Sequence, residues 1–189
     1  YQYQFAHSEV VKILSPAKKL VIGQPLIDGD ILETSNEGLV KILLQNETVI
    51  DIGPSSILQI QNNNILLYQG VLRSTSQNEV FKTTQVTIYS KKAEFIIQTE
   101  NHQSQIEPDF SRTMITTIHG HVVADLMRLN PQGLTYLQPF VVNPAIVLTT
   151  EGRTGISEKI SYKALHLIDL QEKLRKLGPL VNVFATQAA

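Results

Sequence analysis

The sequence predicts an all-β domain, because apolar residues recur with period 2 from residue 20 to about residue 150. Ile50 and Ile52, for example, fall on the strand face opposite Asp51. Turn motifs interrupt this alternation every ~8 to 10 residues, which is typical of a solenoid-like or sandwich-like fold. Because no helical pattern of useful length separates the strand runs, a parallel βαβ sheet is not expected.

The strands are expected between turns rich in Asp, Asn, Gly and Pro, residues that accept positive φ or bond to their own backbone. The first two strands are expected near residues 39–44 and 49–52. Further strands are expected at Leu66–Leu72, Val80–Tyr89, Ala93–Thr99, Met114–Ile118, Val122–Leu126 and Val141–Thr149. The longest loop is expected at Asn101–Arg112, which is polar and carries a proline.

The C-terminus changes period, and this change predicts an amphipathic helix over Ser157–Leu177. Its apolar stripe is Ile160, Ala164, Leu167, Leu170, Leu174 and Leu177. Ser157 is a suitable N-cap, while Gly178 and Pro179 supply a stop. The chain is therefore expected to comprise an N-terminal edge segment (1–19), a β domain (20–150), and a hinge, helix and tail (151–189).

Composition narrows the classes of function. The 189 residues carry a formal net charge of -1, which disfavours nucleic acid as a partner. The absence of cysteine excludes disulfides, thiol catalysis and cysteine-based zinc sites. No apolar run reaches the ~18 residues of a spanning helix, so no membrane span is expected within this chain.

His119, His121 and Asp125 form the one pattern in the sequence that resembles a metal site, because alternate residues of a strand project to the same side. The pattern is similar to the first metal motif of cupins. However, the intervening apolar residues would turn these three side chains away from the core. We therefore expect two surface histidines beside a turn, with a cupin-like metalloenzyme as the minor alternative.

The sequence does not predict an enzyme. It has no Gly-x-Ser-x-Gly nucleophile motif, and its carboxylates sit singly in turns rather than in facing pairs. Gly152-Arg153-Thr154-Gly155 lacks the Lys-Ser/Thr of a phosphate loop and is expected to be a hinge. No cofactor is expected.

Residues 20–73 resemble the opening of a FecR domain. The resemblance rests on Gly23–Thr34, on the strand at 39–44, on residues 47–60, where Gly53-Pro54-Ser55-Ser56 separates two further strands, and on Leu66–Arg73 around Gly70. Residues 80–150 fit the family as a rhythm of strands. Where the family has a Gly-containing turn before Ala93, this chain has Ser90-Lys91-Lys92.

The resemblance implies a FecR-type β domain of the bacterial envelope, periplasmic or secreted, that recognises a protein partner. It also implies a role as the periplasmic part of a signalling relay to an anti-sigma segment. The alternative is a domain that binds glycan or peptidoglycan. The matching residues Gly29, Asp30, Thr34, Gly53 and Gly70 would shape turns and strands.

A FecR-like scaffold of this kind would leave recognition to loops. The expected loops are Asn101–Arg112 and Ser74–Glu79. The candidate binding residues of the first loop are Gln103, Gln105, Glu107 and Asp109.

Overall fold

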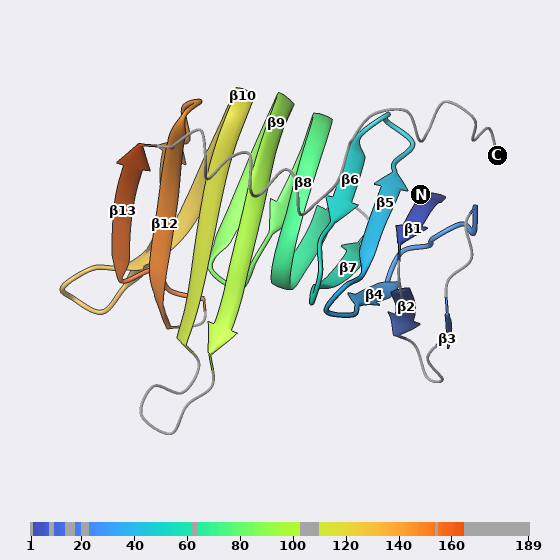
Figure 1. The fold of residues 1–189 in the computed structure, drawn as a ribbon. Coiled ribbons are helices and arrows are strands. Elements are labelled where there is room, and N and C mark those ends of the chain that lie inside the picture. The colour runs from blue at the N-terminus through green and yellow to red at the C-terminus, as the bar shows by residue number, and fades with distance from the viewer. Residues whose placement is uncertain are drawn as a thin grey trace.

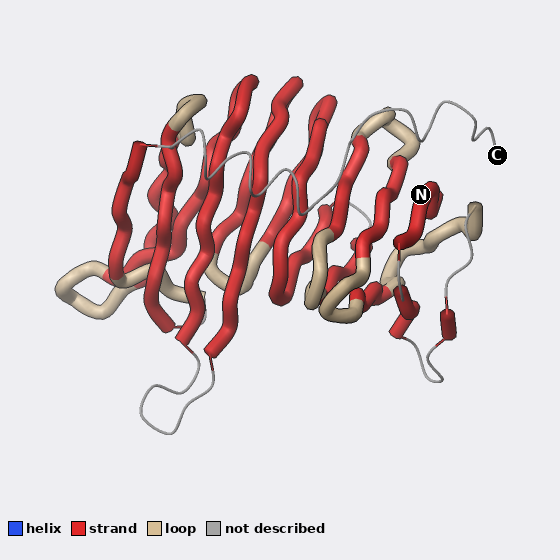
Figure 2. The backbone as a smooth tube through the Cα atoms, viewed as in Figure 1, coloured by secondary structure: helices blue, strands red, loops and turns tan. Residues whose placement is uncertain are grey.

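The computed structural model describes residues 2–7, 10–13, 18–19, 23–61, 64–102, 110–153 and 155–164. Within these ranges the chain consists of strands joined by turns, without a helix (Figure 2). The prediction of an all-β fold is confirmed. In the described part of the chain, no helix has the length and apolar character needed to cross a membrane.

All strand pairs are antiparallel, and together they form one 13-stranded open sheet (Figure 1). The strands are β1 (Gln2–His7), β2 (Val10–Ile13), β3 (Lys18–Lys19), β4 (Ile31–Thr34), β5 (Leu39–Leu43), β6 (Val49–Ile52), β7 (Ile57–Gln61), β8 (Asn64–Lys82), β9 (Val86–His102), β10 (Phe110–Leu129), β11 (Thr135–Val141), β12 (Ile146–Arg153) and β13 (Lys159–Ala164). The order along the main path is β13-β12-β10-β9-β8-β7-β4-β2-β3.

The sheet folds over on itself, because the long strands β8, β9 and β10 bend and contribute to two facing layers. We define layer A as β5, β6, β12, β13 and residues 70–76, 93–102 and 110–118 of the long strands. Layer B comprises β4, β7, β11 and residues 64–69, 78–82, 86–91 and 121–129.

One bend runs through Gly120 and Lys92. Both have positive φ, 90° and 46°, and the β9–β10 register shifts on either side of His119. A Cβ at Gly120 would collide with the carbonyl of Lys92 and the Cα of Ala93. Only glycine therefore allows β10 to approach β9 this closely.

The hydrophobic core lies between the two layers. Phe81 of layer B meets Phe95 of layer A edge to face, with ring centroids 5.2 Å apart. The buried cluster around them includes Leu32, Ile42, Ile50, Leu58, Ile65, Leu67, Ile97, Ile115, Ala124 and Leu148. At the layer A edge, Ile160 of β13 packs against the same cluster.

The prediction that a helix begins at Ser157 is wrong, because Lys159–Ala164 is strand β13, paired with β12. The segment Lys-Ile-Ser-Tyr-Lys-Ala also alternates with period 2, and the edge of β12 satisfies its backbone groups. Tyr162 then reaches Phe140 of β11, with ring centroids 6.0 Å apart. Residues 165–177 of the predicted helix lie outside the described residues.

The expected loop Ser74–Glu79 is also a strand. These residues lie within β8, where Ser74 pairs with Ile50 of β6 and with Phe95 of β9. Polar composition was misleading here because Ser76 is buried and bonds to the Ser90 hydroxyl of the neighbouring strand at 2.7 Å. Similarly, β12 continues through Arg153, so the residues expected to form a hinge begin inside a strand.

The residues shared with the FecR pattern lie at turns, at the end of strand β4 and at a positive-φ position within β8. Thr34 donates a 2.7 Å hydrogen bond to the Gly53 carbonyl and accepts one from the Ser56 N–H at 2.9 Å. Asp30 caps the turn before β4 by accepting a 2.9 Å hydrogen bond from the Ile27 N–H. At Gly70, φ is +102° and a Cβ would lie 2.5 Å from the Ser56 Cα.

Candidate protein-binding surface

The outer face of layer B carries a row of apolar side chains that runs across four neighbouring strands. The register pairs Val80 of β8 with Tyr89 of β9, Tyr89 with Val123 of β10, and Val123 with Val141 of β11. Each residue lies one position from a core residue, which places its side chain on the solvent side of the sheet.

Two further positions along β10 and β11 extend this row. Met127 pairs with Leu137, and Leu129 shares the same face two residues further on. We call the seven residues Val80, Tyr89, Val123, Met127, Leu129, Leu137 and Val141 the layer B surface. Its most exposed members are Tyr89 at 46%, Leu129 at 51%, Leu137 at 59% and Val141 at 51%. The pair Asp125 and Pro139 stands between the Val123–Val141 and Met127–Leu137 pairs of this surface. Large exposed apolar side chains gathered on one face mark an interaction site more often than an ordinary monomer surface.

The β10–β11 hairpin that displays half of this surface is held by its own turn. The Asn130 carboxamide accepts hydrogen bonds from the N–H groups of Gln132 and Leu134 at 3.0 and 2.8 Å. Leu134 itself is 66% exposed at the tip. Because the Asn130 side chain and the backbone together define the turn, the apolar side chains lie on a paired β-hairpin and not on an irregular loop.

In the described chain β11 pairs with β10 alone, so its second edge is unpaired. Pro139 lies within this edge strand and brings no N–H to a further ladder. Such a proline discourages indiscriminate pairing between sheet edges. The side-chain face of the hairpin is therefore better suited to specific binding than its backbone edge.

The bend at Gly120 separates the proposed metal residues. His119 lies on the layer A side, 3.2 Å from the carboxylate of Glu94. His121 and Asp125 lie beyond the bulge, flanking Val123 on the outer face of layer B. No group of three metal-ligating side chains comes together among the described residues. His121 instead lies at the rim of the layer B surface, and Asp125 lies within that surface, between Val123 and Met127 of the same strand.

The candidate binding residues Gln103, Gln105, Glu107 and Asp109 lie outside the described residues. Beside their segment is an open groove of about 340 Å³ near Gly70. The described residues that line it include amide and hydroxyl side chains such as Gln69 and Gln98, and no aromatic ring.

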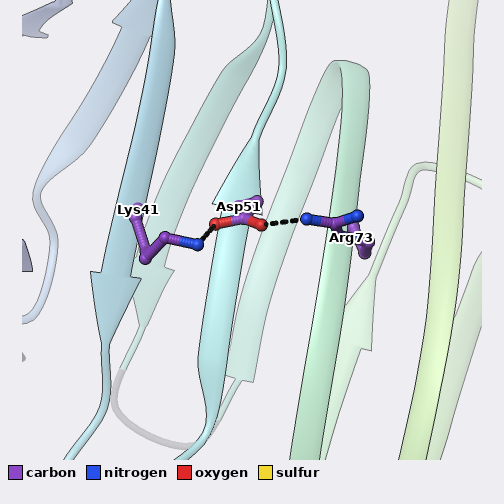
Figure 3. Close-up of polar contacts among 3 residues, drawn as sticks. All are labelled: Lys41, Asp51 and Arg73. Carbon is purple, nitrogen blue, oxygen red and sulfur yellow. Dashed lines mark hydrogen bonds and ion pairs between the residues drawn. The ribbon is translucent and has the colours of Figure 1, made fainter. Parts of the chain in front are cut away.

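The structure also contains a buried ion cluster that the sequence did not reveal (Figure 3). Asp51 of β6 bonds to Lys41 of β5 at 2.7 Å through one carboxylate oxygen and to Arg73 of β8 at 2.8 Å through the other. Burial raises the pKa of Asp51 and lowers that of Lys41, and the hydrogen bonds between them oppose both shifts. The cluster joins three neighbouring strands, because the single carboxylate of Asp51 bonds to both cations.

Two crystal structures of a "putative anti-sigma factor" from Parabacteroides distasonis are similar to this chain, each with a TM-score of 0.52 and 12% sequence identity. The match covers 75% of this chain and 62% of that protein, and at this identity it shows a common fold. No family model and no curated protein matches the sequence.

Proposed function

We propose that this chain is a non-enzymatic protein-binding module of a bacterial signalling pathway and that the layer B surface is its docking face. The observation that carries this proposal is the exposed apolar row from Val80 to Val141, which has a polar rim and spans four strands. The similarity of the fold to an anti-sigma factor and the FecR resemblance of residues 20–73 support the same class of function.

The partner we propose is a protein of the bacterial envelope with an apolar contact surface, and the location we propose is periplasmic or extracellular. The aromatic ring of Tyr89 is the expected anchor, since aromatic residues surrounded by aliphatic ones dominate the energetics of protein interfaces. His121 at the rim and Asp125 within the surface would set orientation rather than affinity.

Site-specific photo-crosslinking tests this proposal. A photoreactive residue placed at Leu137 in the organism that encodes the chain should capture one defined protein. The same residue placed at Glu37, which is exposed in a distant turn, provides the matched control. The captured protein is then purified, and its dissociation constant for the unlabelled chain is measured.

Support requires capture from position 137 and not from position 37, together with a dissociation constant that rises at least tenfold for Val141→Asp. The proposal is contradicted if both positions capture the same proteins, or if Val141→Asp binds as tightly as the unchanged chain. Binding to purified peptidoglycan fragments in place of a protein would favour the glycan alternative.

A further inference from the structure

Two lysines flank the apolar row that crosses the outer face of layer B. Lys82 lies two residues beyond Val80 on β8, and Lys91 lies two residues beyond Tyr89 on the antiparallel strand β9, so the two lysines stand on opposite sides of the row. Because side chains two positions apart in a strand share a face, both lysines project from the same outer face as the row. We call the row, which consists of Val80, Tyr89, Val123 and Val141, the Tyr89 row.

The spacing of the two lysines matches the width of an α-helix. Four residues along a strand and one strand spacing separate Lys82 from Lys91, which is about 14 Å. An α-helix with its side chains is about 10 to 12 Å wide. The Tyr89 row itself spans three strand spacings, about 14 Å, which corresponds to about ten residues of helix. A helix that lies along the row therefore has one lysine on each side.

The positive charge on this part of the surface has no counterpart nearby. Lys91 is exposed and Lys82 partly exposed, and neither makes an ion pair with another residue of the described ranges. Asp125 lies within the layer B surface, but its cross-strand neighbours are Thr87 and Pro139. The half of the surface on β8 and β9 is therefore positive, and an occupant with acidic groups at this end complements it.

A segment bound to the face of a sheet has to satisfy its own backbone hydrogen bonds. The face offers side chains, because the N–H and C=O groups of the strands point along the sheet. An added strand needs an open edge, and the edge strand β11 contains Pro139, which has no N–H for a further ladder. A helix bonds its backbone internally and presents apolar residues every three or four positions on one side. The layer B surface is therefore suited to a helix.

A second copy of the chain is a poor occupant for this surface. The layer B surface extends over three strand spacings and over six residues of β10, from Val123 to Leu129, which is a footprint of about 14 by 20 Å. A stable protein dimer buries about 800 Å² on each partner, more than twice this footprint. A second copy would also bring the same two lysines to the contact rather than the acidic groups that complement them.

We propose that the occupant of the Tyr89 row is an amphipathic helix of a partner protein, with acidic residues on both flanks of its apolar face where it crosses β8 and β9. In this arrangement the apolar face covers Tyr89 and Val123, and the acidic flanks pair with Lys82 and Lys91. The inference rests on the proposed function, because it specifies what docks on the layer B surface.

Three synthetic peptides of about 14 residues test the proposal. The first has leucines at i, i+3, i+4 and i+7 with glutamates beside this stripe, the second has lysines in place of the glutamates, and the third has the residues of the first in strict alternation. Each is titrated into the nitrogen-15-labelled chain and followed by NMR. The first peptide should shift the amide signals of Tyr89 and Val123, with a dissociation constant at least tenfold below those of the other two.

Charge reversal on the chain provides the second arm. Lys82→Glu and Lys91→Glu together should weaken binding of the first peptide at least tenfold. Lys163→Glu is the matched control, since this lysine is exposed on β13 in layer A, and it should change the dissociation constant less than twofold. Circular dichroism establishes that each variant keeps its β fold. The formal net charge of the chain is -1, so a preference for the acidic peptide reports on the local surface and not on the chain as a whole.

The proposal is overturned if the second or third peptide binds as tightly as the first, or if the two lysine reversals leave the dissociation constant unchanged. It is also overturned if the first peptide shifts no signal of the layer B surface at about 1 mM. If photo-crosslinking from Leu137 still captures one defined protein in any of these cases, the docking face stands and only the acidic helix is rejected. Failure of the crosslinking as well would reject the proposed function itself.

Discussion

Lys41 donates a 2.7 Å hydrogen bond to Asp51 from the sheet face opposite the core, and both side chains are buried there. Arg73 completes the cluster on the other side of the carboxylate. Three charges therefore lie at directly opposed positions of three neighbouring strands. Such a cluster fixes strand register, because a slip of one residue would move every charge to the core face.

We expect Asp51→Asn to destabilise the fold by about 3 to 5 kcal/mol, since it removes the buried carboxylate that bonds to both Lys41 and Arg73. Urea denaturation followed by circular dichroism measures this loss. The combined replacement Lys41→Met, Asp51→Leu and Arg73→Met removes all three charges together and should cost less than the single change. A triple variant less stable than Asp51→Asn would show that the ion pairs themselves supply the stability.

Gly70→Ala is expected to be strongly destabilising, because the new methyl group would overlap the backbone of Ser56 where the sheet bends. Gly29→Ala is the matched control: its φ is also positive, at 90°, but no atom lies within 4 Å of its added Cβ. The control should lose only about 1 kcal/mol from backbone strain. Thermal unfolding of the two variants separates the effect of the contact with Ser56 from the effect of a positive φ. Equal losses of stability in Gly70→Ala and Gly29→Ala would contradict the role of the contact.

The stability of the fold should depend on the ionisation of Glu79. Burial raises the pKa of this carboxyl above its usual value of 4.5, although hydrogen bonds from Asn46 and the Val80 backbone oppose the shift. A raised pKa in the folded state means that the folded chain binds this proton more tightly. Protonated Glu79 therefore adds to the free energy of unfolding. This stabilisation is fully present below the pKa of the carboxyl in the unfolded chain, and it is lost as pH rises through the pKa of the same carboxyl in the folded chain.

Glu79→Gln should therefore gain stability relative to the unchanged chain as pH rises from about 4 to about 7. The glutamine keeps an oxygen that can accept the 3.1 Å hydrogen bond from Asn46. Denaturation midpoints of the two proteins across this pH range measure the difference. A difference that stays constant with pH would show that Glu79 has the same pKa in both states.

The sequence predicted the class of fold because strand period and turn residues agreed over more than half of the chain. It failed at Ser74–Glu79 because buried hydroxyls such as Ser76 and Ser90 satisfy each other across strands, and no local pattern reveals such pairs. It failed at Lys159–Ala164 because that segment fits two periods, and tertiary pairing with β12 decided between them.

The candidate surface was missed for a related reason. No strand was predicted at residues 135–140, where the structure has β11 as an edge strand that tolerates Pro139. Without β11, the row from Val80 to Val141 could not be assembled from the sequence, since its members are more than 30 residues apart in pairs such as Tyr89 and Val123. The turn at Asp30, in contrast, was recognisable because this side chain bonds to the Ile27 backbone only three residues away.

The most direct test of the proposed function is made in the organism that encodes this chain. Strains carrying Leu137→Asp, Glu37→Lys or a deletion of the gene are compared with the parent by transcript sequencing, and protein levels are checked by immunoblotting. We expect Leu137→Asp to reproduce the transcript changes of the deletion at an unchanged protein level, while Glu37→Lys resembles the parent. A Leu137→Asp strain with the parent's transcripts, beside a deletion strain that differs, would contradict docking through the layer B surface.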